Sequence, residues 1–415
     1  MFWTSSAGYR WTVRAWLLRL SGKEMSVPAR IPVKDSEAAM LEALARLLLV
    51  FQAVATFKDP ILSLIQPGPG GQGGDTRLAV GGAPFFIFGD SLWDSGNNNY
   101  LDVSAKANYW PYGETFFRNA TGRFCNGRIP PDFIAENANL PFIKPYLDPN
   151  FTDYTFGANF ASGGAGVLPE TSPGTLYLEL QVSFFEDVTK QLRQQKGDSV
   201  AEKLISRAVY YLGMGGNDYL TLGKDSKESN ATLTPHIEEV FVGWVIGNLT
   251  TSIKKLYALG GRKFSFPNVA PMGCMPGNRF ATGTDECWDD LNVLAQMHNE
   301  ALSRVLVGLD KDLPGFKYAV FDYYTTMLDR ITNCADFGFE VGLSACCGSG
   351  AYNGNLTCGV RGDNFTLCPD PNEFVYFDAA HPTEATNRQL SSLMWSGTSP
   401  VMSPRNLKSL FQDHS

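Results

Sequence analysis

The chain of 415 residues has no run of about 18 uncharged apolar residues, which is the length that a membrane-spanning helix requires. It also has no basic excess, because 34 Lys and Arg stand against 42 Asp and Glu, giving a net charge of −8. An acidic chain lacks the electrostatic footprint for nucleic acid or for an anionic membrane surface. The sequence therefore predicts no integral membrane span and no nucleic-acid partner.

Several common catalytic and cofactor-binding motifs are also missing. No serine lies in a G-x-S-x-G elbow, so the ordinary α/β-hydrolase pattern is absent. The sequence contains no Walker loop, H-E-x-x-H motif or Rossmann fingerprint, and none of its eight cysteines forms a C-x-x-C pair. We therefore expect that the protein needs no cofactor and binds no metal ion.

What the chain does contain favours an oxidising secretory compartment. Its cysteines are even in number, and four of the eight fall between Cys346 and Cys368, although the spacing alone does not fix how they pair. Six N-x-[ST] sequons are candidates for N-glycosylation: Asn119, Asn150, Asn230, Asn248, Asn355 and Asn364. Together these features predict a secreted, disulfide-bonded glycoprotein.

The N-terminal region has the composition of a targeting segment followed by a linker. Residues 1–23 carry four basic residues and no acid, which is typical of an organelle transit peptide. Residues 47–57 form an apolar run with an A-x-A site, which would be a signal peptide if translation began at Met40. Our hypothesis is that residues 1–39 are an upstream extension or a disordered tail, and organelle targeting is the alternative. Residues 67–82 are rich in glycine, as flexible linkers are.

Strand and helix patterns alternate in the body of the chain. Short apolar runs indicate buried strands at residues 83–88, 156–160, 208–212, 263–267 and 317–321. Amphipathic helical patterns lie between these runs, and this alternation is typical of a parallel α/β sheet. We expect an extension, targeting segment and linker over residues 1–82, one catalytic domain over 83–400, and a C-terminal tail over 401–415.

Two loops carry residues suited to nucleophilic catalysis. Ser91 directly follows the first predicted strand, where its hydroxyl would be exposed and the N-terminus of a helix would favour negative charge. Asp378 precedes His381 by three residues, so its carboxylate could orient the ring while the other ring nitrogen takes a proton from Ser91. The alternatives are that Ser91 only caps a helix and that His381 is satisfied by its own cap.

Glycine-rich loops supply candidates for an oxyanion hole. The donors would be the backbone N–H of Ser91, a glycine N–H from residues 162–166, and the side-chain amide of Asn217. The alternative for both glycine loops is tight turn geometry. Among the other histidines, we expect His298 to pack or cap within a helix.

These motifs together resemble the large plant branch of the GDSL esterase/lipase family, the SGNH hydrolases. The matching segments are G-D-S-L at 89–92, T-G-R-F at 121–124, N-F-A-S-G-G-A-G at 159–166, G-G-N-D at 215–218 and D-A-A-H-P-T-E at 378–384. The resemblance covers residues 84–396 and is nearest to the secreted, defence-associated members. Two departures are Phe377, where many members have Trp, and Cys125, where many have Ser.

The resemblance implies a three-layer α/β/α sandwich with a parallel sheet of about five strands. It implies that Ser91 is the nucleophile, that Asp378 orients, and that His381 is first the general base and then the acid. The oxyanion hole would combine the Ser91 N–H with Asn217 and Gly164, or with Gly163, since the register in this loop is ambiguous.

The function that the resemblance implies is that of a secreted serine esterase or lipase. It would hydrolyse small-molecule or lipid esters through an acyl-enzyme intermediate, and we expect it to act as a monomer. One alternative is an acyltransferase acting on a sugar or hydroxy-acyl acceptor. Another is a catalytically silent protein that binds a lipid or a glycan.

Overall fold

A central sheet organises residues 82–413, which are the residues that the computed structural model describes. The strand order is β10-β5-β4-β3-β1-β2. The bounds are β1 Phe85–Gly89, β2 Gly157–Asn159, β3 Val209–Gly213, β4 Lys263–Pro267, β5 Lys317–Phe321 and β10 Met402–Ser403. Strands β1 to β5 run parallel, and β10 pairs antiparallel with β5 at the edge. The predicted parallel sheet of about five strands is confirmed, with one antiparallel edge strand in addition.

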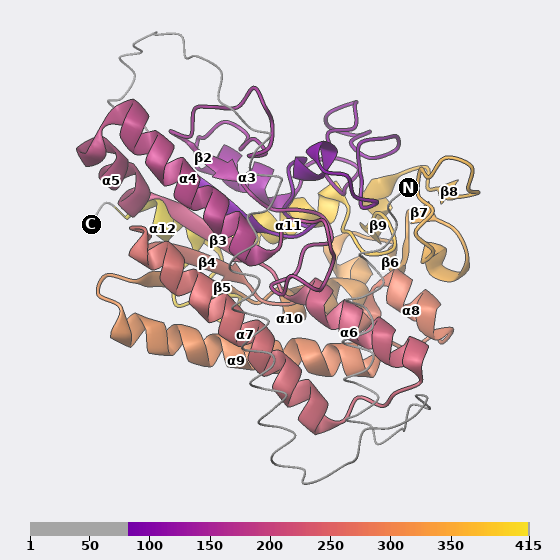
Figure 1. Ribbon diagram of the computed structural model, residues 1–415. Coiled ribbons are helices and arrows are strands. Elements are labelled where there is room, and N and C mark those ends of the chain that lie inside the picture. The colour runs from indigo at the N-terminus through magenta and orange to yellow at the C-terminus, as the bar shows by residue number, and fades with distance from the viewer. Residues whose placement is uncertain (1–81, 414–415) are drawn as a thin grey trace, which may run out of the picture. The chain divides into compact units, whose positions relative to one another are not determined.

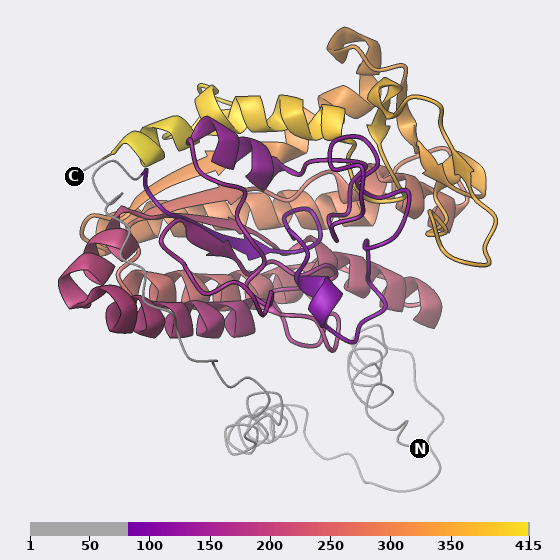
Figure 2. The same cartoon turned by 90° about the horizontal axis from the view of Figure 1, so that it is seen from above.

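Helices cover both faces of this sheet (Figures 1 and 2). One face carries α4 (Leu178–Lys196), α5 (Asp198–Arg207), α7 (Pro235–Ala258) and α9 (Asp289–Asp312). The opposite face carries α3 (Pro130–Asn137), α11 (Glu384–Ser396) and α12 (Leu407–Gln412). Three further helices follow strands β3, β4 and β5, namely α6 (Gly216–Ser229), α8 (Pro276–Thr282) and α10 (Tyr323–Thr332). The predicted three-layer α/β/α arrangement is therefore confirmed.

The side chains of β1 show how the layers are held together. All five residues of this strand are buried, as expected for a central parallel strand with helices on both faces. Successive side chains point to opposite faces, so Phe85 meets Phe411 of α12 while Phe86 meets Phe185 of α4. Burial of each such ring contributes about 2–3 kcal/mol to folding. The apolar run therefore joins the two helical layers through one strand.

The region after residue 400 belongs to the fold, which corrects the expected tail over 401–415. Met402 pairs with Phe321 and adds β10 to the sheet. Helix α12 begins after the cap residue Asn406, and its side chains Leu407 and Leu410 are fully buried. The single domain expected over 83–400 stays a prediction. The extension, targeting segment and linker expected over 1–82 lie outside the described residues, apart from Gly82.

Three disulfides join segments that lie outside the central sheet. Their pairs are Cys274–Cys287, Cys346–Cys368 and Cys347–Cys358, whereas Cys125 and Cys334 are free. Near the last two bonds lie two small sheets, which pair β6 (Val341–Ala345) with β9 (Phe374–Tyr376) and β7 (Cys347–Gly348) with β8 (Thr366–Leu367). Among residues 82–413, no helix has both the length and the apolar character that a membrane span requires.

Candidate active site

Ser91, His381 and Asp378 lie in hydrogen-bonding order. The Ser91 hydroxyl oxygen is 2.7 Å from His381 Nε2, although 290 positions separate the two residues in sequence. His381 Nδ1 is 2.8 Å from Asp378 Oδ1 and 2.9 Å from Oδ2. One ring nitrogen thus meets the carboxylate while the other meets the hydroxyl. This is the geometry of a serine nucleophile with a general base and an orienting acid.

Ser91 is positioned by the end of β1. It lies in a turn two residues after Gly89, and Gln181 of α4 holds that glycine by donating to its carbonyl and accepting from its N–H. No helix begins at Ser91, so the expectation that a helix N-terminus follows it was wrong. Residues 91–93 form a turn, and the next helical residues are the short 3-10 helix at Asn97–Tyr100.

Asp378 and His381 occupy the loop between β9 and α11. This loop ends at Thr383, whose side chain caps α11 by accepting from the Thr386 N–H. Burial of the Asp378 carboxyl acts to raise its pKa, but the charge of His381 and the hydrogen bonds to the carboxylate outweigh burial and hold the pKa below its usual value. Asp378 is therefore ionised when it orients the imidazole ring.

A cavity opens beside Ser91 and His381, and its lining is mainly apolar. The apolar side chains that line it include Leu220, Val269, Met272 and Met275. Asn217 also lines the cavity and is the second residue of α6. Because the first N–H groups of a helix have no partner within it, this end of α6 brings a positive helix terminus to the cavity.

Gly163 and Gly164 of the glycine-rich loop differ in whether the N–H is already hydrogen-bonded. The Gly163 N–H donates to Asp94 Oδ2 at 3.1 Å, whereas the Gly164 N–H has no hydrogen bond within residues 82–413. Asn217 Nδ2 donates to the Ala165 carbonyl at 2.9 Å and so connects α6 to this loop. The free N–H favours Gly164 over Gly163, but neither glycine lines the cavity, and the Gly164 assignment stays a prediction.

Two buried carboxylates organise the loops around the site. Asp94 accepts hydrogen bonds from three backbone N–H groups in its own turn, in addition to the one from Gly163. Asp218 accepts from the N–H groups of Val167 and Leu168, just beyond the glycine-rich loop. Asp218 belongs to the G-G-N-D segment on which the family resemblance partly rests. Gln181 was missed altogether, because nothing in the sequence of α4 indicates a partner 92 positions away.

Three further residues named in the sequence analysis, His298, Phe377 and Cys125, have structural roles. His298 is buried, its Nδ1 lies 2.8 Å from the Tyr219 hydroxyl, and burial lowers its pKa to about 3, in line with the expected packing role. Phe377 packs edge-on against Tyr112 with ring centroids 5.5 Å apart and does not line the cavity. Cys125 is buried, and its sulfur accepts from the Gly127 N–H.

Asp90 places a carboxyl group at the cavity. Its side chain is buried, and one oxygen accepts from the Leu92 N–H at 3.0 Å. Desolvation raises its pKa to about 7, against the smaller opposing effects of the Leu92 hydrogen bond and the charge of His381. This pKa lies above the ordinary value of 3.8, so the folded chain retains a proton at pH values where the unfolded chain has lost it.

Asp90→Asn should change how stability depends on pH. The stability that comes from the raised Asp90 pKa is complete below about pH 4 and is lost as the pH rises toward 7. The amide is neutral throughout, so Tm of the variant minus Tm of the wild type should be greater at about pH 8 than at about pH 5. Thermal melting at both pH values tests this, and a pH-independent difference would contradict the assignment.

Comparison with known proteins gives a consistent match. Residues 85–394 match the family model described as "GDSL-like Lipase/Acylhydrolase". The protein "GDSL lipase" of Tanacetum cinerariifolium is 45% identical over 333 residues, which is 80% of this chain and 88% of that protein. "GDSL esterase/lipase 1" of Arabidopsis thaliana is 42% identical, covering 81% of this chain and 92% of that protein. A crystal structure of the lipase Lip_vut3 from a goat rumen metagenome covers 75% of this chain and 94% of its own, with 12% identity and a TM-score of 0.34.

Proposed function

The chain belongs to the GDSL-like lipase/acylhydrolase family, and we propose that it hydrolyses carboxylic esters through an acyl-enzyme intermediate on Ser91. The observation that carries this proposal is the continuous chain of contacts from the Ser91 hydroxyl through His381 to Asp378. The mainly apolar cavity beside Ser91 supports it, because apolar side chains next to the hydroxyl suit the hydrocarbon part of an ester.

In the proposed reaction, His381 carries each proton. His381 Nε2 takes the proton of Ser91, and the serine oxygen attacks the ester carbonyl carbon to form a tetrahedral intermediate. The intermediate collapses, and His381 returns the proton to the departing alcohol. Water then attacks the acyl-enzyme while His381 takes one of its protons, and that proton returns to Ser91 as the acid leaves. Asp378 stabilises the imidazolium in both halves of the reaction.

We assign the oxyanion to donors on three segments. The Ser91 N–H is one proposed donor, because it makes no hydrogen bond within residues 82–413. Asn217 approaches from the start of α6, and Gly164 is the proposed third donor. Such donors lower the barrier because they already point to the place where negative charge develops.

Ser91→Ala should lower kcat for a p-nitrophenyl ester by about 10⁴-fold or more, because no other group can form the acyl-enzyme. The fold should be intact, as judged by thermal melting. Ser95→Ala is the matched control, because the Ser95 hydroxyl is buried without a partner within residues 82–413. Fluorophosphonate should label the wild type and the control but not Ser91→Ala. Near-normal turnover by Ser91→Ala would refute the proposed nucleophile.

Asn217→Ala should lower kcat by about 10²–10³-fold with a smaller change in KM, because an oxyanion donor acts mainly in the transition state. The side chain also holds the Ala165 carbonyl, so melting curves should be recorded beside the kinetics. A kcat within about twofold of the wild-type value in a stably folded variant would remove Asn217 from the oxyanion hole.

We further propose that the protein is secreted with a cleaved signal peptide and carries N-linked glycans. All six sequon asparagines are exposed, so a glycan at any of them would meet solvent. The three disulfides support folding in an oxidising compartment. The signal peptide suggested at residues 47–57 lies outside the described residues, and the monomeric state stays a prediction.

Expression in a secretory plant host tests this proposal. The protein recovered from the medium should lose mass when its N-glycans are removed enzymatically, and a variant with all six sequon asparagines changed to Gln should lose none. The N-terminal sequence of the secreted protein should begin shortly after residues 47–57. Retention inside the cell, or a mass that the enzyme leaves unchanged, would contradict the proposal.

A further inference from the structure

Within residues 82–413, the Asp378 carboxylate has one hydrogen-bond donor from outside its own loop. Oδ1 accepts from the backbone N–H groups of Ala380 and His381, at 2.9 and 2.8 Å, and the His381 ring approaches both oxygens. The additional donor is the hydroxyl of Tyr112, which is 2.7 Å from Oδ2 and 266 positions away in sequence. A separate segment of the chain therefore contacts the triad at its acid.

Tyr112 is held firmly where it makes this contact. Its side chain is buried, and its ring packs edge-on against Phe377 and Phe124 with centroids 5.5 and 6.2 Å apart. Gly113 has φ +78, and a side chain there would collide with the Asn119 carbonyl. Burial, together with the charge of Asp378, keeps the pKa of Tyr112 well above its ordinary value, so its hydroxyl remains a donor.

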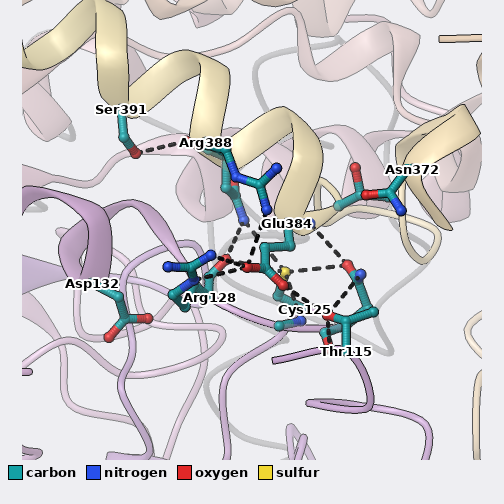
Figure 3. A network of polar contacts seen from close by, with 12 residues as sticks. Thr115, Cys125, Arg128, Asp132, Asn372, Glu384, Arg388 and Ser391 are labelled. Atoms are coloured by element: carbon teal, nitrogen blue, oxygen red, sulfur yellow. Dashed lines mark hydrogen bonds and ion pairs between the residues drawn. The ribbon is translucent and has the colours of Figure 1, made fainter. Parts of the chain in front are cut away.

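The segment that follows Tyr112 is attached to the start of α11 (Figure 3). The Thr115 hydroxyl donates to Glu384 Oε2 at 2.7 Å, and Arg128 Nη2 is 2.7 Å from Glu384 Oε1. The Glu384 N–H in turn donates to Asn126 Oδ1 at 2.9 Å. Because Glu384 lies three residues after His381, the network fixes the Tyr112 segment to the start of α11, next to the loop that carries the His381 ring.

We propose that Tyr112 is a positioning residue for the reaction, acting through Asp378. The inference rests on the proposed function, because it assigns a role within that triad. The phenolic hydroxyl fixes the carboxylate in the rotamer that faces His381 Nδ1. The positive end of the hydroxyl dipole also weakens the attraction between Asp378 and the protonated His381 ring.

Other titratable groups also lie around this pair. Asp90 faces His381, while Tyr109 and Cys125 lie near Tyr112. Burial raises the pKa of both Tyr109 and Cys125, so these two stay neutral through the working pH range. Burial raises the pKa of Asp90 to about 7, and the pH profiles of wild type and variants are compared directly because Asp90 is present in both.

Tyr112→Phe should lower kcat by about tenfold and leave KM near the wild-type value, since the ring stays and only a hydrogen bond to a charged group is lost. Without the hydroxyl dipole, Asp378 holds the protonated ring more strongly. The acidic limb of kcat/KM should therefore move to higher pH by about half a unit. Tyr109→Phe is the matched control, because that ring packs 5.5 Å from Tyr112 without a hydrogen bond to Asp378 within residues 82–413, and it should match the wild type.

A double-mutant cycle tests whether Tyr112 acts through Asp378. In an Asp378→Asn background, Tyr112→Phe should change kcat by less than about twofold, because the carboxylate that it serves is gone. The inference is overturned if Tyr112→Phe behaves like Tyr109→Phe, if its effect is confined to KM, or if its full effect persists in the Asp378→Asn background.

A 3-fluorotyrosine placed at position 112 provides a test that does not depend on Tyr112→Phe folding. It keeps the ring and hydroxyl and makes the hydroxyl a stronger donor, so the acidic limb should move to lower pH, and an unchanged limb overturns the inference. Ser91→Ala in the same assay distinguishes failure of the proposed function from failure of the role proposed for Tyr112. Turnover that survives Ser91→Ala refutes the proposed function, whereas loss of turnover there with a normal Tyr112→Phe refutes only the role of Tyr112.

Discussion

The buried charge of Asp378 is the constraint on which the active-site architecture depends. An ionised carboxylate withdrawn from water costs several kcal/mol unless hydrogen bonds replace its hydration. Here the replacement comes from two backbone N–H groups, the His381 ring and the Tyr112 hydroxyl. The loop before α11 must therefore fold tightly around the carboxylate, and a segment from the early part of the chain must pack against it. The orientation of the base follows from how that charge is satisfied.

The sheet brings the other half of the site within reach of this loop. Strands β1 and β3 are neighbours, and they end in register at Gly89 and Gly213. A side chain at either glycine would collide with Trp93, so Trp93 can pack over both strand ends only because both positions are glycine. Ser91 in the turn after β1 and Asn217 at the start of α6 after β3 consequently line the same cavity. Parallel strands thus place the reacting groups at their carboxyl ends.

The sequence predicted the parts of the fold with a strong local signal. Strands β4 and β5 begin and end where their apolar runs indicated, and the residues proposed for the triad lie together. Strand β10 and helix α12 were missed because two strand residues among prolines give no periodic pattern. The choice between Gly163 and Gly164 depends on which N–H is already bonded, and the contact of Tyr112 depends on a distant partner. Such features exist only in the folded chain.

The separation of 290 positions between Ser91 and His381 has a consequence for biosynthesis. The proposed nucleophile emerges from the ribosome with the first strand, but the proposed base and its carboxylate arrive only with the last loop before α11. A nascent chain therefore has an inert serine during nearly all of its synthesis. The proposed triad can therefore form only after translation of the domain is almost finished.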